Sequence, residues 1–189
     1  SVSLGFSRFC SKKSLLKDTV FLTAGSYAVH YALSDNISEN KGFKHPIYKG
    51  KETPLQNAIS EIKPKNIYFC LGINDITGFG VEGTVKNYCK LINSVWKIDP
   101  DIHIYIVSTT FMKVDAQQKK LNNHNLASLN HNMKTICEKY YNLDYIDIYP
   151  EFINYCNKIS SIKNRSLKDC GFGTPGAIRT RDLPLRRRM

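Results

Sequence analysis

The sequence predicts an α/β domain, built as a three-layer α/β/α sandwich around a parallel sheet. Short apolar segments recur along the chain, and longer segments with helical spacing of apolar residues separate them. Parallel strands need long crossover connections, usually helices, so this alternation favours parallel pairing. The chain has 189 residues, of which 42% are hydrophobic, and this is enough for one domain with a substantial core.

The first predicted strand is the apolar segment Val20 to Thr23, which we expect to be buried. A helix should follow from about Tyr27 to Leu33, with a serine in the turn between the two. Lys41 to Lys51 is expected to be a loop that contains a short strand. Residues 1–17 are expected to be poorly ordered or helical, so that the domain itself spans 18–158.

The next predicted helix begins with a cap. In Thr53-Pro54-Leu55-Gln56, Thr is expected to cap the helix, Pro to take its first position and Gln to lie three residues after the cap. The helix should end near Ile62, because Lys63-Pro64-Lys65 follows. Asn66 to Cys70 then predicts a strand, and Leu71 to Gly80 predicts a glycine-containing loop.

The second half of the chain repeats this alternation. One predicted helix has its apolar face at Val81, Val85, Cys89, Ile92 and Trp96. Another has its apolar face at Leu126, Leu129, Met133, Ile136, Cys137 and Tyr140. Asp99-Pro100 separates the first helix from a strand at Ile102 to Val107, and Leu143 to Tyr149 follows the second helix as the last strand.

Two of the predicted strands lead into polar loops whose residues suit acyl transfer. The first loop reads Gly25-Ser26 and the second reads Gly72-Ile73-Asn74-Asp75. A serine can attack an ester carbonyl, and an asparagine amide can donate to the oxyanion that forms. Ligands of parallel sheets bind outside the carboxyl ends of the strands. We therefore expect the serine and the asparagine to converge at one edge of the sheet.

Each of these residues also has a structural interpretation. Ser26 could be only the N-cap of the helix that follows it, since Ser is a favoured cap. Asn74 and Asp75 could form an ordinary Asx turn. His30 lies one helical turn beyond Ser26, but a histidine on a helix face is more often a surface or core residue. We therefore do not predict His30 to be the catalytic base.

Composition argues against a nucleic-acid groove and against a metal site. The formal net charge is +11, of which +4 falls between Phe172 and Met189, and the other lysines are scattered as on a solvated surface. The six cysteines show no metal-ligand spacing and are expected in the core. His124 and His131 lack an accompanying carboxylate pattern. We expect no metal ion and no organic cofactor.

The two loops resemble conserved blocks of the SGNH/GDSL hydrolases, in the bacterial branch of that family. The resemblance rests on Phe21 to Val29 and on Leu71-Gly72-Ile73-Asn74-Asp75, and it covers roughly Leu16 to Phe152. Later stretches that resemble the family are Ile104 to Ser108, Leu121 through Asn130 and Tyr145 to Ile148. The resemblance implies a flavodoxin-like fold that is incomplete at its C-terminus.

The resemblance also implies roles for single residues. Ser26 matches the nucleophile, Asn74 the oxyanion donor, and Gly72 the glycine that lets the loop turn toward the site. Gly25 stands where the family usually has the aspartate of Gly-Asp-Ser. Gly25, Gly72 and Asp75 are expected to contact the substrate. That substrate would be a small-molecule ester, for example an acylated carbohydrate.

The family takes its base from a late Asp-x-x-His, which this chain lacks. Asp169 aligns only loosely with the aspartate, the third position beyond it is Phe172, and all five histidines precede Asn132. From about Gly173 the sequence resembles the antisense translation of a transfer-RNA gene, so the family's last block would have been lost at that junction. Residues 159–189 are expected to be a disordered basic tail outside the domain.

The sequence thus predicts an ester hydrolase of the SGNH/GDSL type that is truncated and impaired. One alternative is a non-catalytic module on the same scaffold that binds a carbohydrate or another small ligand. A second alternative is a nucleic-acid binder that acts through its basic tail. No apolar run suits a membrane helix. The protein would be cytoplasmic if Ser1 is near the true start and secreted if a leader is missing. The oligomeric state is left open.

Overall fold

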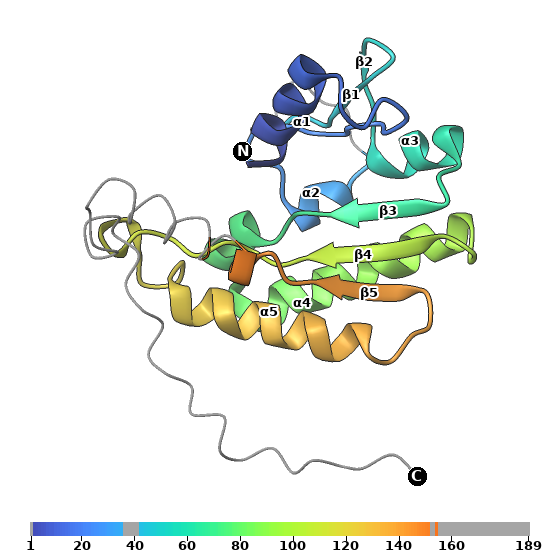
Figure 1. The fold of residues 1–189 in the computed structure, drawn as a ribbon. Helices are drawn as coiled ribbons and strands as arrows, with labels where there is room; N and C mark the ends of the chain where they lie inside the picture. Colours follow the sequence, from blue (N-terminus) through green and yellow to red (C-terminus); the bar gives the residue numbers. More distant parts are fainter. Residues whose placement is uncertain (1, 36–41, 152–153, 155–189) are drawn as a thin grey trace.

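The computed structural model describes residues 2–35, 42–151 and 154, and Figure 1 shows their arrangement. The helices are α1 (Val2–Lys13), α2 (Val29–Ala32), α3 (Leu55–Ile62), α4 (Ile73–Ile98) and α5 (Asn123–Cys137), with a 3-10 turn at Val114–Ala116. The strands are β1 (Ile47–Tyr48), β2 (Lys51–Glu52), β3 (Asn66–Phe69), β4 (His103–Val107) and β5 (Leu143–Ile146).

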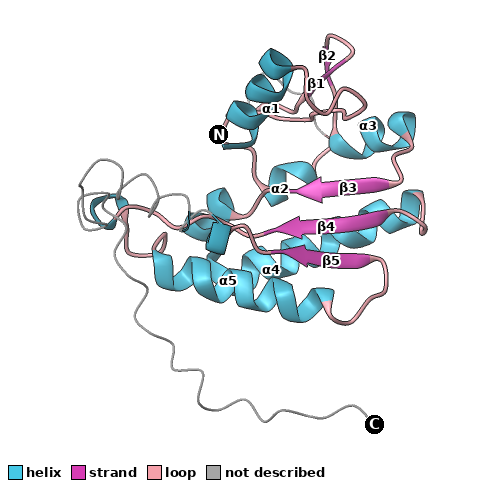
Figure 2. Ribbon diagram, viewed as in Figure 1, coloured by secondary structure: helices cyan, strands magenta, loops and turns pink. Residues whose placement is uncertain are grey.

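Strands β3, β4 and β5 form a parallel sheet in that order, and Figure 2 shows all three running the same way. Ile67 pairs with Ile104, and Ile104 pairs with Leu143. Helix α4 connects β3 to β4, and α5 connects β4 to β5. This alternation confirms the predicted α/β class with a parallel sheet. β1 and β2 form a separate antiparallel hairpin.

The core lies between one face of the sheet and the helices α4 and α5, which pack against each other. Ile104 and Ile106 of β4 alternate toward this core and are buried. Tyr88 of α4 and Leu129 of α5 meet them there and are almost fully buried. Burying a large apolar side chain contributes about 1.5–3 kcal/mol. The packing of Tyr88 and Leu129 in this core therefore fixes α4, including its first turn, relative to the sheet.

The opposite face of the sheet is largely open in the part of the chain that the structure describes. Tyr68 on β3 is 57% exposed and stacks on Tyr105 of β4, with 4.6 Å between ring centroids. His103 Nε2 pairs with Asp144 Oδ2 at 2.7 Å on the same surface. The described residues thus supply the sheet and one helical layer, and the second layer of the predicted sandwich is not among them.

The first predicted strand was wrong, because Val20 to Thr23 pairs with no strand in the described residues. Val20 is 51% exposed, whereas Leu22 and Ala24 pack partly against the core. An apolar run indicates that a segment tends to be buried. A strand also needs a neighbouring strand that forms hydrogen bonds with its backbone N–H and C=O groups. The segment is instead an irregular connection from α1 to the turn at Ser26.

Two helix starts also differ from prediction. Helix α3 begins at Leu55 with Pro54 as its cap residue, and the Thr53 hydroxyl donates to the Lys51 carbonyl instead of capping the helix. The predicted loop from Leu71 to Gly80 is helical from Ile73 onward. Gly80, at φ +65, interrupts α4, and the Thr84 hydroxyl donates to the Gly80 carbonyl. Helical spacing at Val81 onward therefore revealed only the second part of α4.

Residues 2–13 form α1, in which Cys10 is buried. The free cysteines found among the described residues are Cys10, Cys70, Cys89 and Cys137. The predicted tail, 159–189, lies outside the described residues, as does the predicted domain boundary at 158. None of the helices that the structure describes is long and apolar enough to cross a membrane.

Candidate active site around Ser26 and Asn74

Ser26 lies in an exposed turn just before α2, and its backbone is in the left-handed region at φ +53. A non-glycine residue there costs about 1–2 kcal/mol, and such strain gathers at functional positions. Ala28, not Ser26, is the N-cap of α2, and no side chain of that cap accepts a hydrogen bond. The capping interpretation of Ser26 is therefore excluded, and the residue is exposed.

Gly72 shapes the second loop, which leads from β3 into α4. Its φ of +104 is a conformation that other residues rarely adopt, and it is the N-cap residue of α4. A Cβ at this position would lie 3.1 Å from Leu129 Cδ2 and 3.2 Å from Tyr88 Cε2. Gly72 is therefore needed for the turn and for close packing on the core. Gly72 is buried, and its expected contact with substrate stays a prediction.

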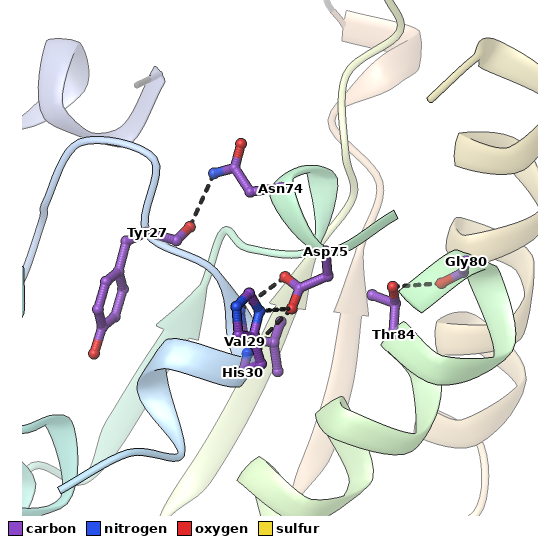
Figure 3. Close-up of polar contacts among 7 residues, drawn as sticks. All are labelled: Tyr27, Val29, His30, Asn74, Asp75, Gly80 and Thr84. Carbon is purple, nitrogen blue, oxygen red and sulfur yellow. Dashed lines mark hydrogen bonds and ion pairs between the residues drawn. The ribbon is translucent and has the colours of Figure 1, made fainter. Parts of the chain in front are cut away.

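Asn74, in the first turn of α4, joins the two loops. Its Nδ2 donates to the backbone carbonyl of Tyr27 at 3.0 Å, as Figure 3 shows. Tyr27 directly follows Ser26, so the amide of Asn74 lies within one residue of the serine. Both Asn74 and Ser26 are exposed. The structure therefore brings together the two loops that the sequence singled out.

Asp75 is fully buried and binds the start of α2. Its Oδ2 accepts from the backbone N–H of Val29 at 2.8 Å, and its Oδ1 accepts from the backbone N–H of His30 at 3.1 Å. These are donors at a helix start that would otherwise lack partners. The buried carboxylate of Asp75 thus holds the turn that carries Ser26, and its expected contact with substrate stays a prediction.

His30, which the sequence did not lead us to predict as the base, binds the same carboxylate. Its Nδ1 lies 2.8 Å from Oδ1 of Asp75, and its side chain is 29% exposed (Figure 3). The ring packs against Tyr31 and Phe79, with centroid distances of 3.9 Å and 4.8 Å. The sequence showed a histidine one turn after Ser26, but not that an aspartate distant in sequence would bind it.

The side chain of Tyr27 contacts a second buried polar residue, His45. The Tyr27 hydroxyl lies 2.9 Å from His45 Nδ1, and the His45 backbone N–H donates to Glu52. Burial, and then the charge of Glu52, raise the pKa of the Tyr27 hydroxyl well above its usual range. Tyr27 thus remains a neutral phenol that anchors the chain next to Ser26.

A shallow depression, with no enclosed space for a water molecule, lies next to Leu71. Its lining includes Leu71, Tyr88 and Leu129 on the core side and Thr109 and Asn130 on the polar side. The Asn130 side chain accepts from the Thr109 backbone N–H at 2.9 Å and donates to the Thr109 carbonyl at 3.1 Å. The polar groups of this wall are thus satisfied by one another.

No model of a protein family matches the sequence, and no curated protein matches it. Among solved structures, the chain is similar to one from Streptococcus pneumonia that is provisionally described as a platelet activating factor. The identity is 16%, the TM-score is 0.41, and the overlap covers 50% of each chain. The chain thus spans half the length of that structure.

The other predicted site residues are less constrained. Gly25 is exposed beside Ser26, and a Cβ there would meet no atom within 4 Å. Its expected role in substrate binding stays a prediction. His124 and His131 both lie exposed on α5. Within residues 2–35 and 42–151, no group of three or more His, Cys, Asp or Glu side chains could hold a metal ion.

Proposed function

We propose that this chain is a serine ester hydrolase of the SGNH/GDSL type, with Ser26 as nucleophile and Asn74 as oxyanion donor. The observation that carries the proposal is the hydrogen bond from Asn74 Nδ2 to the Tyr27 carbonyl, which holds the amide beside an exposed serine. The backbone of Ser26 is also in the left-handed region, next to the residue whose carbonyl Asn74 binds.

The reaction would proceed in two steps through an acyl enzyme. Ser26 Oγ attacks the carbonyl carbon of a small-molecule ester, and the alcohol leaves. Water then releases the acyl group from the serine. The Asn74 amide carries two N–H groups, one of which binds the Tyr27 carbonyl, and the other is available for the oxyanion. An acyl or acetyl ester, such as an acylated carbohydrate, fits this chemistry.

Without a base for Ser26, turnover would be slow relative to an intact family member. The late Asp-x-x-His that supplies the family's base is absent from the sequence. Loss of a base from a catalytic triad lowers kcat by several orders of magnitude, but the oxyanion hole alone still gives catalysis above the uncatalysed rate. A sensitive assay with an activated ester is therefore required.

The test compares the wild-type chain with Ser26→Ala on p-nitrophenyl acetate. A fluorophosphonate probe, followed by peptide mass spectrometry, should label Ser26 and no other serine. Ser60→Ala is the matched control, because Ser60 is exposed and its hydroxyl only donates to the Gln56 carbonyl of its own helix. Hydrolysis that Ser26→Ala leaves unchanged contradicts the proposal. Binding of an acylated sugar without turnover or labelling supports the binding module instead.

A further inference from the structure

We propose that His30 is the general base for Ser26 and that Asp75 orients it, in place of the late Asp-x-x-His. This inference rests on the proposed function. The pair joins Nδ1 of a partly exposed imidazole to a fully buried carboxylate at 2.8 Å. An imidazole held in this way by a carboxylate is the arrangement that a serine nucleophile requires.

The contacts of Asp75 determine which nitrogen of His30 is free. Both carboxylate oxygens already accept a backbone N–H, one from Val29 and one from His30. A carboxylate accepts and does not donate, so the bond to Nδ1 requires the imidazole proton on Nδ1. In the neutral ring, Nε2 then carries a lone pair. This is the tautomer of a histidine that removes a proton from a serine.

The surroundings of His30 keep its ring in place. Tyr31 and Phe79 pack against the imidazole. Nε2 has no hydrogen-bond partner within the described ranges 2–35 and 42–151. The hydrogen bond of Nδ1 to Asp75 therefore orients the ring, and Nε2 on the other side of the ring is available as an acceptor.

The other four histidines, all of which lie in the described ranges, offer no such arrangement. His45 is 1% exposed and bound to Tyr27, and His103 pairs with Asp144 on the open face of the sheet. His124 and His131 on α5 have no carboxylate partner among the described residues. Among the five histidines, only His30 both contacts a buried carboxylate and lies in the same chain segment as Ser26.

Ser26 and His30 are four residues apart, and the segment between them is fixed at three points. Asn74 binds the Tyr27 carbonyl, and Asp75 binds the backbone N–H groups of Val29 and His30. No hydrogen bond joins Ser26 Oγ to His30 Nε2 in this structure. The proposal requires the exposed Ser26 side chain to turn toward the imidazole when the ester binds, since catalytic hydrogen bonds often form only in the complex.

Each proton transferred in the reaction then has a donor and an acceptor within the site. As Ser26 Oγ bonds to the carbonyl carbon, its proton passes to His30 Nε2 and the carbonyl electron pair moves to oxygen. When the carbon–oxygen bond to the alcohol breaks, the proton on Nε2 passes to the leaving oxygen. Water repeats the cycle on the acyl enzyme, so water is the only co-reactant. The Asp75 carboxylate stabilises the imidazolium that forms.

Two substitutions of His30 separate a base from a structural contact. In His30→Asn the amide Nδ2 can replace the Nδ1 donor to Asp75, but nothing replaces Nε2. In His30→Gln the amide reaches the position of Nε2, but the short donor to Asp75 is lost. Comparing the melting temperatures of both variants with that of the wild type shows whether the fold survives.

The experiment measures kcat, KM and the rate of fluorophosphonate labelling for the wild type, Ser26→Ala, His30→Asn and His30→Gln. We expect both His30 variants to lower kcat and the labelling rate by about 10²–10⁴-fold with KM little changed. His30→Asn should melt close to the wild type. Retention of Ser26-dependent activity within threefold in folded His30→Asn overturns the role of His30 alone. Absence of Ser26-dependent turnover and labelling in the wild type overturns the proposed function as well.

Discussion

The Nδ2 of Asn74 lies 3.0 Å from the carbonyl oxygen of Tyr27, so the first turn of α4 is bonded to the residue that follows Ser26. The next residue of the same turn, Asp75, binds the start of α2. One dipeptide thus performs two tasks: the exposed amide lies at the serine, and the buried carboxylate holds the helix behind it. The position of Ser26 depends on both contacts.

Replacing Asp75 by alanine should therefore cost stability as well as activity. The change leaves two backbone N–H groups and the Nδ1 of His30 without their acceptor in a buried place. Each buried donor left without its acceptor costs about 1–3 kcal/mol. Urea unfolding measures the change in the free energy of unfolding.

Glu82→Ala is the control for Asp75→Ala, because Glu82 lies exposed on the same helix, α4. A surface substitution of this kind should stay within about 0.5 kcal/mol of the wild type. If the two variants unfold at the same urea concentration, then the buried carboxylate does not hold the turn, and the account of Asp75 is wrong.

Gly72→Ala should destabilise the protein by about 1–3 kcal/mol. The added methyl group would lie 3.1 Å from Leu129 and 3.2 Å from Tyr88, on a backbone at φ +104 that disfavours any side chain. Gly78→Ala provides the comparison, because a Cβ at Gly78 meets nothing within 4 Å and the residue lies in α4. Thermal unfolding should separate the two variants. Equal melting temperatures would contradict the packing argument.

Ser26→Gly should be more stable than Ser26→Ala by about 1 kcal/mol, although both lose the hydroxyl. The reason is the left-handed backbone at φ +53, which glycine adopts without strain and alanine does not. Chemical denaturation of the two variants checks this difference, and both should lack the proposed esterase activity. A more stable alanine variant would show that the turn at this position relaxes.

Much of the fold could be predicted because it depends on local patterns of apolar and polar residues in the sequence. The apolar run from Ile102 to Val107 identified β4, and the apolar positions from Leu126 to Met133 identified α5. The loops after β3 and before α2 were recognised by glycine next to a polar residue. These features depend on a few neighbouring residues, so one sequence suffices to find them.

The remaining features depend on contacts between distant residues. Val20 to Thr23 is apolar like a strand but lacks a partner, and apolarity does not reveal pairing. The contact of His30 with Asp75 spans 45 residues, so no local spacing predicts it. The sequence also did not show which of Asn74 and Asp75 points outward. In an α-helix consecutive side chains point in different directions, and only the packing of α4 decides which is buried.

The protein should lose stability as the pH rises above about 9, in part through Cys137. This thiol is 5% exposed, and burial, followed by the charges of Asp144 and Glu138, raises its pKa from 9.0 to about 12. Between these values the folded protein keeps a proton that the unfolded chain releases, so the free energy of unfolding falls with pH. The contribution is complete below pH 9 and is lost as the pH approaches 12.

Cys137→Ala removes this group and should make the alkaline decline shallower. Urea unfolding from pH 7 to pH 11, under reducing conditions, measures the effect. Below pH 8 the variant should differ from the wild type by a constant amount, due to the lost packing of the sulfur, and above pH 9 that difference should shrink. The buried hydroxyls of Tyr88 and Tyr145 also have raised pKa values, so some decline should remain in the variant. Parallel curves across the whole range would mean that the Cys137 thiol ionises equally in the folded and unfolded chains.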